Sequence, residues 1–587
     1  MTTPTDPAPH TASGPLAEAT SWESQWARVP EEWARPIYRI YADPFNEVFL
    51  RNQFYLRANR ANTEHDFTPQ APQRFAQEIA WWVWTCWHQQ LRKIEPSLLA
   101  WTVRTLPAAI AEHTTRTGRP AESIADLDPG DMLRQAVLVF QRRNNRLPSA
   151  GSRRNITHLI EHLHLHIAVR CTDTRWWAHD IWDLRADPRI PQRPHEPSHD
   201  KTVRLRGIEP DWLRDGLRFW LRSALTYDLL TWSSVVDRVR NVGSQLGRFT
   251  RTHGYLRDPL IETDPDALRV AFVDYLNYLR SPEAATHSDR LTADTVASLQ
   301  AQTQAFYTFM HDHSAEAATA TGDARWRDIT VTHTALWSPI NAPRHRRRER
   351  DLTWHSTADL QRMLTYLDVL AAEATEKVVL NNPDGTISVV AGLGDPQGAR
   401  VWLLQALTGR RASEILMLDY DPLEAIPGLE RPTDTDGGAF VARLRYQQTK
   451  VDGVIPTILV EQAIVDIIAK QQKWLKAKYP ALHPRYLFLG LKNQHRGERP
   501  RPYTTYRAML TKLDKMHNLV DSAGRPLRFT QTHRLRHTRA TELLNDGVPF
   551  HVVQRYLGHK SPEMTARYAA TLAATAEAAF LKHKKIG

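Results

Sequence analysis

The chain contains very little cysteine. Only Cys86 and Cys171 occur among its 587 residues, and they lie far apart in no paired spacing. This usage excludes a disulfide framework and a zinc finger built from cysteine pairs, and it is typical of a reducing compartment. The sequence also lacks a run of about 18 apolar residues, and residues 1–20 have neither the basic nor the apolar segment of a secretion signal. We therefore expect a cytoplasmic protein without a membrane span.

The composition is that of an ordinary folded protein. Hydrophobic residues make up 42% of the chain and charged residues 24%, which suffices to bury large cores. The length predicts about three domains at typical domain sizes. Lys and Arg number 76 against 65 Asp and Glu, a net charge of +11. A positive balance suits a polyanionic partner, although a basic solvated surface explains the charge equally well.

Helical patterns dominate residues 1–199, which we interpret as a helical N-terminal region of unknown role. The proline-rich segment 186–200 that ends the region is predicted to be a linker. The tryptophan-rich stretch WWVWTCW at 81–87 is predicted to be core, since large aromatic side chains are usually buried. Three histidines share one helical face, at His158, His162 and His166. Zinc binding needs further ligands that the sequence does not supply, so we expect a polar helix face and no metal.

Residues 200–343 are predicted to form a second helical unit. An apolar stripe at Leu213, Leu217, Trp220 and Leu221 indicates an amphipathic helix after Pro210. A basic stripe lies beside it, at Arg214, Arg218 and Arg222. A solvated charged face and contact with phosphates explain this second stripe equally well. The unit ends in the arginine-rich segment NAPRHRRRERD at 341–351, which is suited to follow a nucleic-acid backbone.

Strand patterns first enter beyond residue 351. The stretches FVARLRYQQTK and VIPTILV, at 440–450 and 454–460, predict a hairpin with Lys450 at its tip. KVVLNNPDGTISVV at 377–390 predicts another hairpin. Helices follow, and Ser561-Pro562-Glu563 begins a helix that places Tyr568 about two turns in. We therefore expect an α+β fold, mainly helical with a small antiparallel sheet.

The same part of the chain holds a set of residues suited to phosphoryl transfer. Attack on a phosphodiester needs a nucleophile, cations on the non-bridging oxygens and a proton donor for the leaving oxygen. LTGRRASE at 407–414 offers two arginines near a helix start, and HRLRHTRAT at 533–541 offers a histidine and an arginine one turn apart. Arginine suits the task because its planar fork holds two phosphate oxygens and stays charged. Each fragment alone is weak evidence, and their order and spacing give them weight.

Taken together, TGRRASE, the lysine hairpin, HRLRHTRAT, LGH and a tyrosine nine residues later resemble the tyrosine recombinase (integrase) family over residues 350–575. The 200–343 unit is more loosely similar to that family's core-binding domain. The resemblance implies a catalytic set without a metal or other cofactor. In this set Arg411 is the first catalytic arginine, supported by Glu414, and Lys450 is the general acid. His533 and Arg536 are the second phosphate-binding pair. His559 donates to the phosphate, and Tyr568 is the nucleophile.

The function implied is a site-specific recombinase of a mobile element that integrates, excises or transposes DNA through a 3′-phosphotyrosyl intermediate. Residues 200–343 would be its DNA-binding domain and 344–587 its catalytic domain with a C-terminal tail helix. Double-stranded DNA is the expected partner, bound by a homotetramer on two sites, with accessory proteins as further candidates. Two other readings stay open. One is a type IB topoisomerase, and the other is a non-catalytic DNA-binding protein with a relic pocket.

The arginine-rich segment gives a prediction that charge alone can test. Replacing Arg346, Arg347 and Arg348 with alanine should weaken binding to all duplexes and make the affinity less dependent on salt. With fewer phosphate contacts, fewer counterions are released from the DNA on binding. The measurement is a salt series of dissociation constants on unrelated duplexes. An unchanged salt slope would show that these arginines do not contact DNA.

Overall fold

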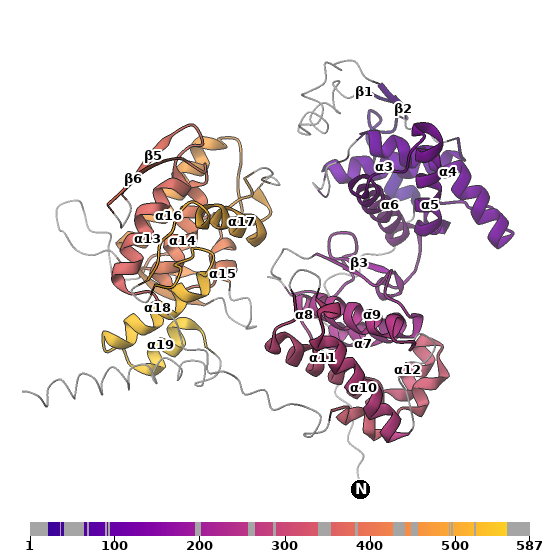
Figure 1. Cartoon of the computed structure of the whole chain (residues 1–587). Coiled ribbons are helices and arrows are strands. Elements are labelled where there is room, and N and C mark those ends of the chain that lie inside the picture. The colour runs from indigo at the N-terminus through magenta and orange to yellow at the C-terminus, as the bar shows by residue number, and fades with distance from the viewer. Residues whose placement is uncertain are drawn as a thin grey trace, which may run out of the picture. The chain divides into compact units, whose positions relative to one another are not determined.

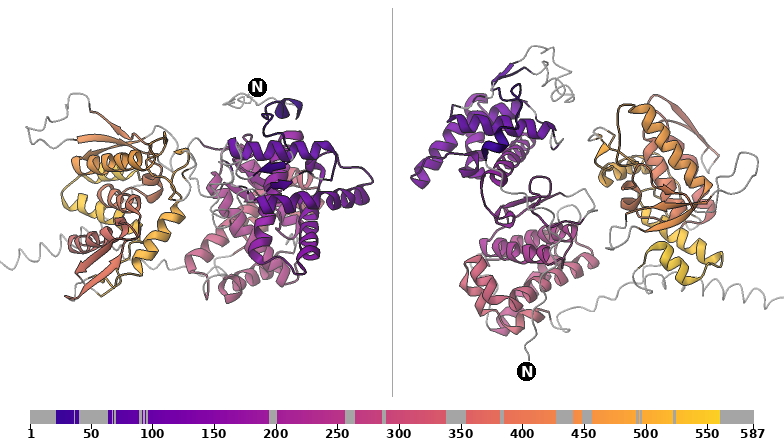
Figure 2. Two further views of the ribbon diagram at one scale, coloured as in Figure 1. Left: turned by 90° about the horizontal axis from the view of Figure 1, so that it is seen from above. Right: turned by 180° about the vertical axis from the view of Figure 1, so that it is seen from behind.

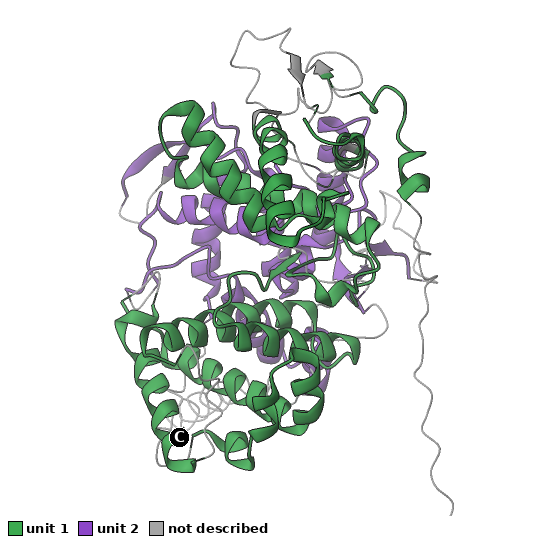
Figure 3. Ribbon diagram, turned by 90° about the vertical axis from the view of Figure 1, so that its right-hand side faces the viewer, with its two compact units in different colours: residues 1–192, 201–343 green, residues 193–200, 344–587 purple. Residues whose placement is uncertain are grey.

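The computed structural model describes residues 22–35, 37–39, 64–66, 68, 70–88, 91, 94, 96–193, 201–255, 264–285, 289–337, 354–381, 385–426, 441–447, 456–491, 494, 497–521 and 524–559 (Figure 1). The chain divides into two compact units, one of residues 1–192 and 201–343 and one of residues 193–200 and 344–587 (Figure 3). Each unit is described by itself below. Among the described residues, no helix is long and apolar enough to cross a membrane.

The first part of the N-terminal unit is a helical bundle. Its helices are α1 (Trp22–Trp26), α3 (Gln73–His88), α4 (Pro96–Thr117), α5 (Pro129–Asn144) and α6 (Ala150–Cys171), with 3-10 turns at Ile124–Asp126 and Trp176–Ala178 and a short antiparallel pair, β1 (Ile37–Arg39) with β2 (Glu64–Asp66). Trp81 and Trp82 of α3 are buried in its core. The prediction that the tryptophan-rich stretch is core is confirmed for these two residues.

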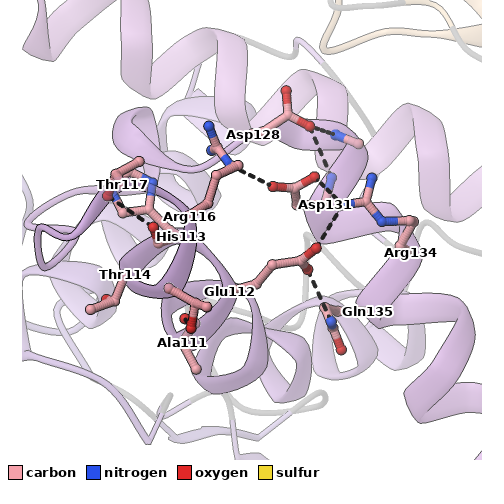
Figure 4. Close-up of polar contacts among 12 residues, drawn as sticks. Ala111, Glu112, His113, Thr114, Arg116, Thr117, Asp128, Asp131, Arg134 and Gln135 are labelled. Atoms are coloured by element: carbon pink, nitrogen blue, oxygen red, sulfur yellow. Dashed lines mark hydrogen bonds and ion pairs between the residues drawn. The ribbon is translucent and has the colours of Figure 1, made fainter.

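Helices α4 and α5 are also joined by a polar cluster, which Figure 4 shows. The Arg134 guanidinium contacts Glu112 at 2.6 Å and Asp131 at 2.5 Å, and the Gln135 amide donates to Glu112 at 3.0 Å. The Arg134 side chain is 61% exposed. Exposed pairs of this kind contribute little to stability, so the apolar core supplies most of the packing energy of this bundle.

The predicted histidine face of α6 is packed against other rings. The Trp82 indole donates a hydrogen bond to Nδ1 of His162 at 3.1 Å, and the rings of His162 and His166 stack with centroids 4.2 Å apart. Burial lowers the pKa of His166 to about 4, so this side chain is neutral at neutral pH. In the part of the chain that the structure describes, no group of three His, Cys, Asp or Glu side chains is placed to hold a metal ion.

The proline-rich segment 186–200 joins two paired strands. β3 (Ile181–Asp183) pairs antiparallel with β4 (Thr202–Arg204). Of the residues between them, Ala186 and Ile190 are buried. The linker prediction is therefore wrong for 186–190. The flanking strands could not be predicted, because three residues are too few to show a period of two in the sequence.

The second part of the N-terminal unit is another helical bundle. It contains α7 (Asp211–Thr226), α8 (Trp232–Arg238), a π-helical turn (Val239–Gly243), α9 (Ser244–Thr252), α10 (Pro265–Arg280), α11 (Ala293–Asp312) and α12 (Ser314–Thr321), with 3-10 turns at Pro282–Ala284, Ala324–Asp328 and Val331–Ala335. The stripe predicted on α7 is buried in its core, as Leu213, Leu217, Trp220 and Leu221. The amphipathic helix predicted after Pro210 is thus confirmed.

The C-terminal unit combines helices with two small sheets (Figure 1, Figure 2). Its helices are α13 (Thr357–Ala371), α14 (Pro396–Thr408), α15 (Ala412–Leu416), α16 (Gln462–Lys478), α17 (Tyr503–Asp514), α18 (Thr532–Asn545) and α19 (Phe550–Leu557). β5 (Lys377–Asn381) pairs with β6 (Ile387–Ala391), and β8 (Val441–Arg445) pairs with β9 (Thr457–Glu461) and with β7 (Leu423–Glu424). The strand pairing of both predicted hairpins is confirmed, while the predicted tip with Lys450 lies outside the described residues. The strand β7 was not predicted. The α+β fold class is confirmed.

A buried ion pair fixes the start of α14. Arg501 donates to both carboxylate oxygens of Asp395, at 2.6 and 2.5 Å, and both side chains are fully buried. Asp395 also accepts from the backbone N–H of Gly398 at 2.9 Å, so it caps the helix. Removing one member of such a pair leaves a buried charge without its counter-charge, which costs far more than the pair contributes.

We expect Asp395→Ala to destabilise the C-terminal unit by about 3–5 kcal/mol, because Arg501 would remain buried without a carboxylate. Denaturant unfolding of the variant measures this cost. The double variant Asp395→Ala/Arg501→Met should recover part of the loss, since it removes both charges. A double variant no more stable than the single one would show that the helix cap, and not the charge, accounts for the loss.

Candidate active site

The turn between α14 and α15 presents two consecutive arginines. α14 ends at Thr408, and Gly409 continues with a φ of +64°, a conformation that a side chain would strain. Arg411 then caps α15, and its guanidinium and backbone N–H both donate to Glu414, at 2.7 and 3.0 Å. The Glu414 carboxylate is fully buried, while Arg411 keeps 13% of its side chain exposed. Glu414 thus orients Arg411.

Arg410 points into the protein instead. It is 1% exposed and lies against two tyrosine rings, with its guanidinium carbon 4.5 Å from the ring centroid of Tyr446 and 5.2 Å from that of Tyr556. One amino group donates to the Tyr446 hydroxyl at 2.5 Å, and the other donates to the backbone carbonyl of Tyr556. The sequence analysis treated Arg410 only as a neighbour of Arg411.

Helix α18 brings Arg536 to the same place. Its guanidinium donates to the Gly409 carbonyl at 3.0 Å and to the Leu557 carbonyl at 2.6 Å, and the side chain is buried. His533, one turn earlier on α18, is exposed, and its ring stacks on that of His537 with centroids 5.8 Å apart. Because Arg536 binds both Gly409 and Leu557, it joins the arginine turn to the end of α19.

His559 follows α19 directly. Gly558 has a φ of +68° and turns the chain, so that the His559 backbone N–H donates to the Gln554 carbonyl at 3.0 Å. The side chain is 8% exposed. Burial first, and then the positive charges of Arg536, Arg411 and Arg410, lower the pKa of His559 to about 3. Its imidazole is therefore neutral at neutral pH and still offers one N–H as a donor.

The structure thus gathers Arg411, Glu414, Arg536 and His559 from three separate segments. Among the described residues, the charges that act on the Tyr446 hydroxyl are the guanidinium groups of Arg410, Arg411 and Arg536 and one carboxylate, that of Glu414, which pairs with Arg411. A partly buried site with an excess of fixed positive charge attracts an anion strongly, since low hydration leaves the charges weakly screened. The arrangement is suited to hold a phosphodiester against Arg411 and His559. Lys450 and Tyr568 lie outside the described residues, as do Arg346, Arg347 and Arg348.

The basic stripe predicted on α7 lies in the N-terminal unit and is largely matched by acids. Arg214 contacts Asp211 at 2.8 Å and Asp215 at 3.1 Å. Arg218 contacts Asp215 at 3.2 Å and also pairs with Asp180. Arg222 differs, with its guanidinium carbon 4.3 Å from the ring centroid of Trp177. The local charge of this face is therefore much smaller than the three arginines suggest.

Comparison with known proteins points to one family. Residues 399–574 match the model of the phage integrase family. The C-terminal part of this chain is a tyrosine recombinase domain. Every described site residue that the sequence predicts in this unit falls within the matched range.

Two curated relatives accompany the family match. A segment of 154 residues is 33% identical to transposase B of transposon Tn554 from Staphylococcus aureus, covering 26% of this chain and 22% of that protein. A segment of 128 residues is 32% identical to tyrosine recombinase XerC of Listeria monocytogenes, covering 22% of this chain and 37% of that protein. The chain thus spans about a fifth of the length of the transposase that it matches.

Among solved structures, the integrase of transposon Tn1549 in complex with a circular intermediate DNA aligns with a TM-score of 0.37 and 15% identity, covering 60% of this chain and 94% of that chain.

The recombinase domain contains two site residues that the sequence analysis missed. Tyr446 and Tyr556 both lie against Arg410, and the pKa of Tyr446 is raised by burial. The sequence did signal Arg410, as the first of two adjacent arginines. Nothing in the spacing indicates that this arginine turns inward while its neighbour stays accessible.

The depressed pKa of His559 predicts a loss of stability in acid. An unfolded histidine takes up a proton near pH 6.5, whereas folded His559 resists protonation down to about pH 3. The unfolded state therefore binds more protons in this window, so the free energy of unfolding falls as the pH falls through it. His559→Asn should make that decline shallower, as measured by unfolding at pH 7, 5.5 and 4.5. Equal declines in both proteins would contradict the burial of a neutral imidazole.

Proposed function

We propose that this protein is a site-specific DNA recombinase of a mobile element, which cuts and rejoins strands through a 3′-phosphotyrosyl link to Tyr568. The observation that carries the proposal is the convergence of Arg411, Arg536 and His559 on one buried positive centre. The matched family, and relatives named as a transposase and a tyrosine recombinase, support it.

In the first step, the Tyr568 oxygen attacks the phosphorus of a DNA phosphodiester. The new bond joins tyrosine to the 3′ phosphate while the bond to the 5′ oxygen breaks, and Lys450 gives that oxygen a proton. Arg411, Arg536 and His559 stabilise the charge on the non-bridging oxygens. A free tyrosine has a pKa of about 10, so its proton must be removed with assistance. We assign this role to His533, which is exposed and one turn from Arg536.

In the second step, the 5′ hydroxyl of a partner strand attacks the phosphotyrosine and releases Tyr568. One phosphoester replaces another, so neither a nucleoside triphosphate nor another cofactor is required. Exchange between two duplexes requires all four strands to be cut, and each protomer supplies one nucleophile. We therefore propose that a homotetramer on two double-stranded DNA sites is the active form. Within each protomer, residues 200–343 and the arginines at 346–348 are proposed to bind the duplex.

The decisive test separates packing from catalysis at Tyr568. Tyr568→Phe keeps the ring but removes the oxygen that attacks phosphorus. We expect DNA affinity to remain and covalent joining to disappear. The assay uses nicked duplexes made from the ends of the element that carries the gene, which are denatured in detergent after reaction and examined for protein on the 3′ end.

Tyr556→Phe is the matched control, because Tyr556 lies on the preceding helix and contacts Arg410 with its ring, which phenylalanine retains. This control should form adducts like the original protein. Adducts that persist with Tyr568→Phe and vanish with Tyr556→Phe would move the nucleophile and break the proposed assignment.

A further inference from the structure

We propose that Arg410 is a positioning residue, which holds His559 and the end of α19 against the end of β8 and the turn that leads to Arg411. The inference deepens the proposed function and rests on it for the role of His559. The observations that support it are the burial of the Arg410 side chain and its hydrogen bonds to Tyr446 and Tyr556.

Arg410 cannot itself bind DNA in this structure. Its side chain is 1% exposed, and its guanidinium is covered by the rings of Tyr446 and Tyr556. In the described part of the chain, no carboxylate forms an ion pair with it. A buried cation without an anionic partner is costly. It is held here by ring faces, a hydroxyl and a carbonyl, which offset part of that cost.

The partners of Arg410 come from two different parts of the site. Tyr446 directly follows β8, and its backbone N–H donates to the Pro456 carbonyl at 3.2 Å, so it continues the pairing of β8 with the chain before β9. Tyr556 lies in the last turn of α19. Arg410 itself directly precedes Arg411. One side chain therefore connects the turn before Arg411, the end of β8 and the end of α19.

The end of α19 is held by two arginines. Arg410 binds the Tyr556 carbonyl, and Arg536 binds the next carbonyl along the chain, that of Leu557. The last carbonyls of a helix have no partner within it and form its negative end, so two guanidinium groups satisfy and stabilise them. Because Gly558 and His559 follow immediately, fixing these carbonyls fixes where His559 leaves the helix.

The charge of Arg410 also acts on His559. Among the described residues, the charges that act on the imidazole are those of Arg536, Arg411 and Arg410, followed by that of His537, and all of them disfavour its protonation. Glu414, which lies near the same arginines, is paired with Arg411. Arg410 thus helps to keep His559 neutral, in the form that donates one N–H without adding a further buried charge.

The test follows the protonation of His559 in the full-length protein without DNA, by NMR of isotope-labelled histidine. The His559 signal is the one absent from His559→Asn. Arg410→Gln removes the charge and should raise the pKa of His559 above its value of about 3. Arg410→Lys keeps the charge and should shift it less. Arg400→Gln is the matched control, because Arg400 lies on α14, the helix that precedes Arg410, and contacts Gln471 and Trp474.

An unchanged His559 titration in Arg410→Gln would overturn the proposal and leave Arg410 as core packing. If Arg410→Gln does not fold, Tyr446→Phe keeps the ring but removes the hydroxyl partner, and an undisturbed His559 signal in it would count equally against the proposal. Covalent joining provides a second readout. Arg410→Gln should slow it by up to about 100-fold, because His559 would be displaced, while DNA affinity is retained. The titration needs no DNA, so it remains decisive even if Tyr568→Phe shows the proposed function to be wrong.

Discussion

The repulsion among three guanidinium groups in one poorly hydrated place is the constraint on which the C-terminal unit depends. Arg410, Arg411 and Arg536 all influence the same buried surroundings, and Glu414 is the carboxylate that balances one of them. The remaining positive charge is held by carbonyls at helix ends and by tyrosine rings. Because low hydration leaves these charges weakly screened, they would attract an anion that reached them more strongly than charges in water would.

Much of this site was readable from the sequence because its signals are local. Gly409, Arg411 and Glu414 stand at fixed offsets across a helix boundary, and the structure places them as that spacing predicts. The role of Arg536 came from the family resemblance, because a histidine and an arginine one helical turn apart are weak evidence alone. The roles of Lys450 and Tyr568 remain predictions, since both lie outside the described residues.

The contacts that were missed depend on residues far apart in the chain. Tyr446 and Tyr556 are separated by more than a hundred positions, and only the folded structure brings both rings to Arg410. The basic stripe on α7 shows the reverse case. Its spacing was read correctly, but Asp180 and Asp215 supply charges that cancel much of it. Net charge along a sequence does not reveal which charges are already matched in space.

The β3–β4 hairpin has two apolar faces, and each belongs to a different core. Ile181 and Ala186 pack with Leu165 and Val169 of α6, whereas Trp182 and Val203 are part of the core built around α7. The two helical bundles of the N-terminal unit are therefore packed together through the β3–β4 pair, and they are not independent domains joined by a flexible linker. A gene fragment cut near codon 200 would separate one strand from its partner and uncover apolar surface on both pieces. Domain boundaries for expression, and any shuffling of this region during evolution, are best sought outside the hairpin.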